Sequence, residues 1–424
     1  MTGPLRELAA SRTAGRPRGI ASICSAHPMV LRAALRLAAR TDEPVLIEAT
    51  CNQVNHLGGY TGMRPADFVA RVLTIAAEEG CPADRILLGG DHLGPSPWRH
   101  LPAAAAMAEA ETMMRAFVEA GFRKLHLDAS MGCAGEADGL DDETTANRAA
   151  HLAAIAEDAA TGQGEARPLY IIGTEVPPPG GADHELTDIA PTRPDAARRT
   201  LAVHEAAFRA AGLVPAWDRV IGLVVQPGVE FGNRNVIGYD RKTAAPLARM
   251  LEEHPQLVFE AHSTDYQGET ALRALVEDGF AILKVGPELT FLLREALYGL
   301  DLIASDLIAD YGERPLYYAM DAAMCADPGH WARHYAGPPA EQKLLRHYSL
   351  SDRIRYYWPA PEARAAVDRL FDSLGGRPIP APLLRQHLPW IDADIPCDPE
   401  ALVIRHITHG LETYRAACRG DLPA

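Results

Sequence analysis

The sequence has few cysteines, no long hydrophobic run and no concentration of basic residues. Its 424 residues include seven cysteines, which are scattered, odd in number and never spaced as a CxxC pair. This usage is typical of a reduced cytosolic protein without a disulfide framework or a structural zinc site. No run approaches the roughly 18 apolar residues of a membrane span, and the first residues lack the apolar core of a secretory signal. We therefore expect a soluble, cytoplasmic protein with no membrane partner.

Positive charge is also scarce. The formal net charge is −15 at pH 7, and basic residues cluster no further than short pairs such as Arg198-Arg199. Proteins that bind a phosphate backbone usually carry basic clusters, so this distribution argues against nucleic acid as a partner. A local basic pocket for a phosphorylated metabolite is still compatible with it. The chain also has neither a GxGxxG segment after its first expected strand nor a GxxxxGK[ST] loop, so it offers no recognisable cradle for ATP phosphates.

Short apolar segments alternate with helical segments over residues 19–305. The expected strands are 19–24, 44–50, 86–95, 124–128, 169–176, 220–226, 257–262 and 280–285. Most are continuously apolar, as parallel strands covered on both faces are. Eight such strand–helix units predict an α/β fold, a (β/α)8 TIM barrel, and we favour it over a doubly wound open sheet. Residues 1–18 are expected to form a short helix and a loop before the barrel.

Residues 306–424 do not continue this alternation. They are rich in His, Tyr, Trp and Pro, and helical patterns recur around 340–349, 360–374 and 399–418. We interpret this part as a C-terminal helical extension that packs on or near the mouth of the barrel.

Polar residues close nearly all of the expected strands, where the active site of a TIM barrel lies. They are His27, Glu48, Asn52, Asp91, His92, Asp128, Glu175, Gln226, Glu230, Glu260, His262, Lys284 and Glu288. Every strand must end somewhere, so polar ends alone prove little. However, Glu48, Glu175 and Glu260 are embedded in apolar runs, where an unpaired carboxylate is costly. Glu260 and His262 are two residues apart, so they project from the same face of a strand.

These strand ends predict a metal site of open coordination. Two imidazoles, His92 and His262, together with the Glu175 carboxylate would bind a divalent ion such as Zn, Mn or Mg. Asp91 would lie beside the ion and transfer a proton, and Glu175 is a second catalytic candidate. The choice of ligands among the embedded glutamates and His262 depends on strand register, so it stays open.

Other residues are candidates for binding substrate. Lys284 can hold a phosphate as a point charge, or form a salt bridge with a buried glutamate. The segment 348–358 is either a docking segment or an arginine and aromatic lid, in which Arg353 or Arg355 grips a phosphate. The remaining candidates come from the strand ends: His27, Glu48, Asn52, Asp128 and Gln226. His27 precedes a proline, so it also suits a capping role.

Nine segments in order resemble the GatZ/KbaZ family, the D-tagatose-1,6-bisphosphate aldolase Z-type subunits. They are GIASICSAHPMVLRAAL (19–35), VLIEATCNQVNHLGGYTGM (45–63), ILLGGDHLGPSPW (86–98), HLDASMGC (126–133), IGTEVPPPGG (172–181), VVQPGVEFG (224–232), FEAHSTDYQ (259–267), ILKVGPELTF (282–291) and YSLSDRIRYYW (348–358). Several are long, uncommon strings, so the match is specific. The resemblance implies a class II aldolase-like barrel and a place in galactitol, N-acetylgalactosamine or tagatose catabolism.

The resemblance also implies roles for individual residues. Asp91 and His92 are similar to the acid/base and the metal-binding histidine of class II aldolases. Ser263 and Asp265 are expected where such aldolases hold the substrate phosphate.

Two functions follow from the resemblance. The first is a metal-dependent C4-epimerase that interconverts D-tagatose 6-phosphate and D-fructose 6-phosphate, or the free ketoses, by a retro-aldol route. The alternative is a non-catalytic, chaperone-like partner of a Y-type class II aldolase subunit. A non-catalytic chain has little physical reason to keep a complete set of acid, ligands and substrate groups, which favours the enzyme. The sequence leaves open whether the chain forms a homo-oligomer.

Overall fold

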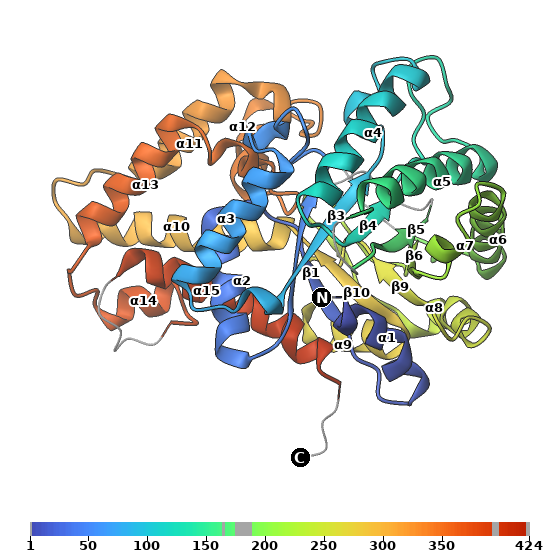
Figure 1. The fold of residues 1–424 in the computed structure, drawn as a ribbon. Helices are drawn as coiled ribbons and strands as arrows, with labels where there is room; N and C mark the ends of the chain where they lie inside the picture. Colours follow the sequence, from blue (N-terminus) through green and yellow to red (C-terminus); the bar gives the residue numbers. More distant parts are fainter. Residues whose placement is uncertain (1, 163–165, 174–188, 392–397, 421–424) are drawn as a thin grey trace.

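The core of the protein is a closed barrel of eight parallel strands (Figure 1). The computed structural model describes residues 2–162, 166–173, 189–391 and 398–420. The barrel strands are β1 (Ile20–Ile23), β2 (Val45–Thr50), β3 (Ile86–Leu93), β4 (Lys124–Leu127), β5 (Leu169–Ile172), β6 (Val220–Val225), β9 (Val258–Ala261) and β10 (Phe280–Val285). Their order around the barrel is β1-β10-β9-β6-β5-β4-β3-β2, which confirms the predicted (β/α)8 fold.

Helices follow the strands as the sequence predicted. They are α2 (Pro28–Thr41), α3 (Pro65–Glu78), α4 (Ala103–Glu119), α5 (Asp142–Ala159), α6 (Pro194–Ala210), α8 (Arg241–Arg249), α9 (Gly268–Glu277) and α10 (Pro287–Leu307). Four of them begin with proline, whose fixed φ suits the first turn, where no N–H is needed. A short helix α7 (Val214–Trp217) precedes β6, and β7 (Glu230–Phe231) pairs with β8 (Val236–Ile237) outside the barrel. Among the described residues, no helix has both the length and the hydrophobicity to cross a bilayer.

In the C-terminal part, the residues that the structure describes form five further α-helices. They are α11 (Pro315–Ala326), α12 (Pro339–Tyr348), α13 (Pro361–Leu374), α14 (Ala381–His387) and α15 (Pro399–Cys418). The sequence predicted α12, α13 and α15 but neither α11 nor α14. Asp321 is the one charged residue of α11, so no polar face marks that helix, and α14 is only seven residues long. In Figure 1, α11, α13 and α14 gather with α10 on one side of the barrel.

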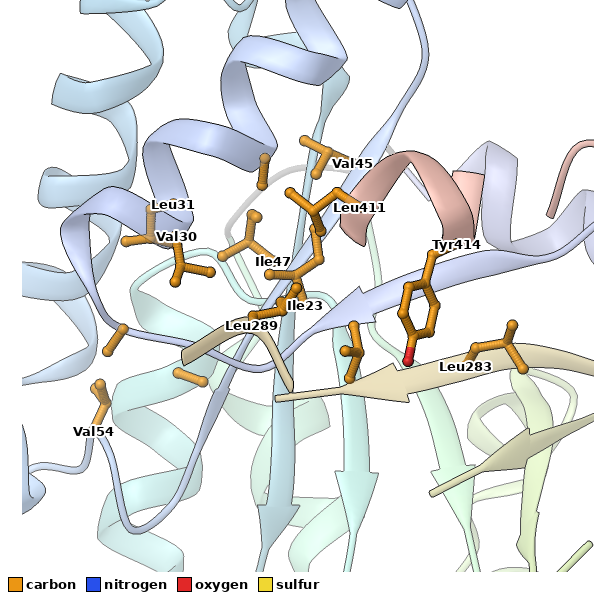
Figure 2. Close-up of a cluster of buried hydrophobic side chains, with 14 of the residues drawn as sticks. Ile23, Val30, Leu31, Val45, Ile47, Val54, Leu283, Leu289, Leu411 and Tyr414 are labelled. Carbon is orange, nitrogen blue, oxygen red and sulfur yellow. The ribbon is translucent and has the colours of Figure 1, made fainter. Parts of the chain in front are cut away.

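Helix α15 belongs to the outer layer of the barrel. It packs between α9 and α2 and against β1, whereas α10 packs on α15, α14 and α13. The Gly19 N–H, just before β1, donates to the Cys418 carbonyl over 2.8 Å. Figure 2 shows Leu411 and Tyr414 of α15 in one buried cluster with Ile23 of β1 and Leu283 of β10. Helix α15 therefore completes the helical layer that packs on the outer face of β1.

The interior of the barrel changes from apolar to charged along its axis. Near the strand starts, apolar side chains pack with α1 (Gly3–Thr13), and they include Ile20, Leu46, Leu87, Val258 and Ile282. Side chains on a strand alternate between its faces, so Val258, Glu260 and His262 follow one another inside the barrel towards its mouth. Charged and imidazole groups thus lie above an apolar floor.

Candidate active site

A cavity of about 810 Å³ opens at the C-terminal ends of the barrel strands. Its lining includes residues near the ends of β1, β2, β3, β9 and β10 or just after them, together with the segment after α12. The predicted site residues in that lining are His27, Asn52, Asp91, His92, His262, Ser263, Asp265, Lys284 and Arg355. Most of the predicted site residues therefore lie around one cavity.

Two buried lysines bind the carboxylates beneath this cavity. Lys124 Nζ lies 2.6 Å from Glu48 Oε1 and 2.6 Å from Glu260 Oε2, and none of these side chains is exposed. Lys284 Nζ lies 2.8 Å from Asp91 Oδ1 and also pairs with Glu48. Buried charges are tolerated only when they are paired, and this arrangement pairs all three carboxylates with ammonium groups.

The backbone at the end of β3 is shaped around these groups. A Cβ on Gly89 would lie 2.4 Å from Glu48 Oε1, and one on Gly94 would lie 1.6 Å from the Asp128 carbonyl oxygen. Between them, His92 has a left-handed φ of 51°, a conformation that is uncommon for residues other than glycine. The two glycines let the chain approach its neighbours, and the turn at His92 ends the strand within the cluster.

Three imidazoles meet above the lysines. The ring centroids of His92, His126 and His262 lie 5.1 to 5.2 Å apart. Asp128 Oδ2 lies 2.8 Å from His92 Nδ1, and Asp91 Oδ1 lies 2.9 Å from His126 Nδ1. The buried Nε2 of His126 has no hydrogen-bond partner among the described residues. Carboxylates thus orient two of the rings, as they commonly do for metal-binding histidines.

This group of residues fits a divalent cation. One atom from each of Asp91, His126, Glu260 and His262 lies within 4.8 Å of the others. Four buried carboxylates of the cluster face two lysine ammonium groups, so the acidic side chains outnumber the lysines. Imidazole and carboxylate donors suit Zn and Mn. Of the predicted metal ligands, His262 belongs to this group, His92 lies beside it, and Glu175 lies outside the described residues.

The electrostatics of the cluster fix the charge of its members. Burial opposes the charged form of Asp91, but His92 and Lys284 hold its pKa well below the usual range. Burial lowers the pKa of His262 to about 4 in spite of Glu260, so this imidazole is neutral and able to bind a metal. Burial also opposes the charge of Lys284, yet Asp91 and other acidic groups raise its pKa well above the ordinary value. Asp91 is therefore a carboxylate and Lys284 an ammonium group.

Four predicted substrate-binding residues do not line the cavity: Glu48, Asp128, Gln226 and Arg353. Gln226 Oε1 accepts hydrogen bonds from the Gly228 and Val229 N–H groups, over 2.7 and 2.9 Å. An Arg353 N–H donates to the His330 carbonyl over 3.1 Å. These positions favour support of the site over contact with substrate.

Arg355 lies at the rim of the cavity. Its guanidinium stacks 4.5 Å from the centre of the Tyr356 ring and donates to the Asp352 carbonyl over 3.0 Å. Tyr356 packs edge-on against Tyr60, which follows β2, with 4.9 Å between ring centroids. These contacts fix the Arg355 group beside the loop after β2.

Sequence reasoning missed two central residues of β4. Lys124 and His126 lie four and two residues before Asp128, so all three share the inward face of the strand. The prediction used only the residues at the ends of strands. The alternation of side chains along β4, counted back from Asp128, would have pointed to Lys124 and His126. The sequence showed Glu260 embedded in an apolar run, but no definite role in the site was predicted for it.

Comparison with known proteins identifies the family. The family described as D-tagatose-1,6-bisphosphate aldolase subunit GatZ/KbaZ-like matches residues 5–419. The chain belongs to the GatZ/KbaZ-like family. The resemblance seen in nine sequence segments is thereby confirmed.

Two relatives of this GatZ/KbaZ-like protein carry names of their own. A protein of Agrobacterium fabrum strain C58, called D-tagatose 6-phosphate 4-epimerase, is 58% identical over 98% of this chain and 99% of its own. A crystal structure from Sinorhizobium meliloti 1021, titled a probable tagatose 6 phosphate kinase, is 54% identical. It covers 95% of this chain and 100% of its own, with a TM-score of 0.87. The same barrel is therefore present in a solved relative.

Proposed function

We propose that this chain is a divalent-metal-dependent epimerase that interconverts D-tagatose 6-phosphate and D-fructose 6-phosphate at C4. The convergence of the His92 and His262 imidazoles, the Asp91 carboxylate and the Lys284 ammonium group on one cavity carries the proposal, and the buried His126 ring packs against both imidazoles. The name of the Agrobacterium relative supports it. The kinase title of the Sinorhizobium relative is less compatible with this chain, because the sequence has no phosphate-binding loop for ATP.

A retro-aldol route suits these groups. The hydrogen on C4 is not acidic because no carbonyl is adjacent, so direct deprotonation there is disfavoured. Instead, the Asp91 carboxylate takes the C4 hydroxyl proton while the C3–C4 bond breaks and its electrons move onto the C2 carbonyl. This leaves an enediolate and an aldehyde. The aldehyde turns its other face, the C3–C4 bond re-forms, and Asp91 returns the proton to the C4 oxygen.

The charge that develops at C2 and C3 needs a positive partner. A divalent cation held by His126, Glu260 and His262 would act as a Lewis acid at the C2 carbonyl. The Lys284 ammonium group lines the same cavity and adds a fixed positive charge. Arg355 suits the C6 phosphate, because its planar fork matches phosphate oxygens.

The test uses the chain purified alone and loaded with Mn²⁺, Zn²⁺ or Mg²⁺. We expect it to convert D-tagatose 6-phosphate to D-fructose 6-phosphate, followed by NMR, and to lose that activity in EDTA. Asp91→Asn should lower kcat by about 10²- to 10⁴-fold, the usual contribution of a general base. Asp138→Asn changes a fully exposed carboxylate and serves as the matched control.

A different result would support the partner-subunit function. In that case the isolated chain would be inert with every metal, yet would raise the activity or half-life of a co-expressed Y-type class II aldolase subunit. Equal activity of wild type and Asp91→Asn would remove Asp91 from the mechanism.

A further inference from the structure

The N-terminus of α10 opens onto the cavity. Gly286 and Pro287 line it directly after β10, and the residues after the neighbouring strand β9 line it as well. These strands are the seventh and eighth of the barrel. In (β/α)8 barrels, the loops after these two strands and a helix N-terminus frequently hold a substrate phosphate, because free N–H groups and the helix dipole attract anions.

In this chain a carboxylate already fills that position. Asp265 Oδ1 accepts hydrogen bonds from the N–H groups of Gly286, over 3.0 Å, and Glu288, over 2.8 Å. The Asp265 side chain lines the cavity and the residue is 2% exposed. A second carboxylate, that of Glu288, is held nearby by the Tyr266 N–H over 2.7 Å and the Tyr414 hydroxyl over 2.8 Å. The donors that would receive a phosphate are therefore occupied, and a second acidic side chain lies beside them.

The other end of the cavity has the opposite character. Arg355 is held beside Tyr60, after β2, and Asp91 lies near the end of the adjacent strand β3. Around the mouth, β10 and β1 separate β9 from β2. Asp265 and Arg355 thus lie on different arcs of the mouth, with Lys284 of β10 between them.

We propose that Asp265 is a specificity-determining residue that admits a C1 hydroxyl and rejects a C1 phosphate, which makes the site selective for ketose 6-monophosphates over 1,6-bisphosphates. The inference rests on the proposed function, in which C4 lies beside Asp91. With C4 there, C5 and the C6 phosphate extend towards Arg355, and C1 extends towards the α10 N-terminus. A carboxylate at that end accepts a hydrogen bond from a C1 hydroxyl but repels a C1 phosphate.

Binding of the two sugars separates this selectivity from turnover. Isothermal titration of the metal-loaded full chain, carrying Asp91→Asn to prevent conversion, would compare D-tagatose 6-phosphate with D-tagatose 1,6-bisphosphate. We expect the monophosphate to bind at least about tenfold more tightly, since placing like charges together is costly. Adding Asp265→Ser should free the two N–H groups and raise the affinity for the bisphosphate at least about tenfold. Asp265→Asn keeps an acceptor on the same donors without the charge, and should give a smaller gain.

Asp368→Asn is the matched control, because it removes one negative charge elsewhere in the cavity lining. It should leave the ratio of the two affinities unchanged. Equal binding of the two sugars by the Asp91→Asn chain overturns the inference, as does an unchanged ratio in both Asp265 variants. If Asp265→Ser fails to fold, Asp265→Asn decides alone. An enzyme that epimerises the monophosphate but binds the bisphosphate equally well overturns only this inference, whereas a chain that binds neither sugar overturns the proposed function as well.

Discussion

The buried Nε2 atom of His126 has no hydrogen-bond partner among the described residues. An unpaired polar atom in the interior costs about 1–3 kcal/mol, and a metal ion would satisfy it. Asp91 holds the opposite side of the ring through Nδ1, over 2.9 Å. Burial and orientation therefore both direct this residue towards a ligand, although it lies within a strand and not at its end.

We expect His126→Gln to lower the affinity of the chain for Mn²⁺ or Zn²⁺ by at least about tenfold, since one ligand is removed. The measurement is metal content by mass spectrometry after gel filtration, at limiting free metal. His151→Gln changes a half-exposed histidine that pairs with Glu111, and is the control. Equal metal content in wild type and His126→Gln would remove His126 from the ligand set.

Glu230 should make stability depend on pH. Burial raises the pKa of its carboxyl group to about 7. Its Oε1 accepts from the Phe231 N–H over 2.9 Å, whereas Oε2 has no hydrogen-bond partner among the described residues. Because the folded-state pKa lies above the unfolded value of 4.5, the folded chain favours the neutral acid. The stabilisation is complete below pH 4.5 and is lost as the pH rises towards 7 and beyond.

We therefore expect Glu230→Gln, which stays neutral, to gain stability relative to wild type between pH 5 and pH 8. The gain should be on the order of 2 kcal/mol. Urea unfolding at the two pH values measures it. Parallel changes in the two proteins would show that Glu230 does not titrate in the folded chain as described.

Helix α15 reaches the active site as well as the outer layer of the barrel. The Tyr414 hydroxyl lies 2.8 Å from the Thr264 carbonyl oxygen and 2.8 Å from Glu288 Oε2. Thr264 lies between Ser263 and Asp265, two residues that line the cavity. The last helix therefore helps to fix the loop after β9, which contributes to substrate binding in the proposed function.

Tyr414→Phe should weaken this connection, because it removes the one hydroxyl proton that these two buried acceptors share. We expect the free energy of unfolding to fall by about 1–3 kcal/mol and KM to rise. Metal content should be unchanged, because strand β9 still positions Glu260 and, directly after it, His262. Kinetics and metal analysis on one preparation test both parts. Tyr318→Phe, at a position 50% exposed, is the control. A lower stability with unaltered KM would limit Tyr414 to a structural role.

At the scale of the whole molecule, the barrel was predictable because its evidence is local. Each strand is a short apolar run between turns, and eight of them in alternation with helices leave few architectures. The position of α15 was not predictable. Its amphipathic pattern shows that it packs on something, but no local feature distinguishes β1, almost 400 residues earlier in the chain, from other partners.

The residues of the site also include some that the sequence alone indicates and others that only the closed barrel brings together. Asp91, His92, His262 and Lys284 could be found from the rule that TIM-barrel sites lie at strand ends. The pairing of Glu48 with both Lys124 and Lys284 could not, because those partners come from strands that meet only in the closed barrel. Asp265 was expected to bind phosphate, whereas its hydrogen bonds to the α10 N-terminus support the opposite proposal.

The contact between α15 and β1 has a consequence for biosynthesis. The first strand leaves the ribosome early, but the helix that covers its outer face is completed only at Cys418. Chains grow at about 5–20 residues per second, so the apolar outer face of β1 stays uncovered for tens of seconds. During that interval the nascent chain depends on chaperones or on temporary contacts to cover this face.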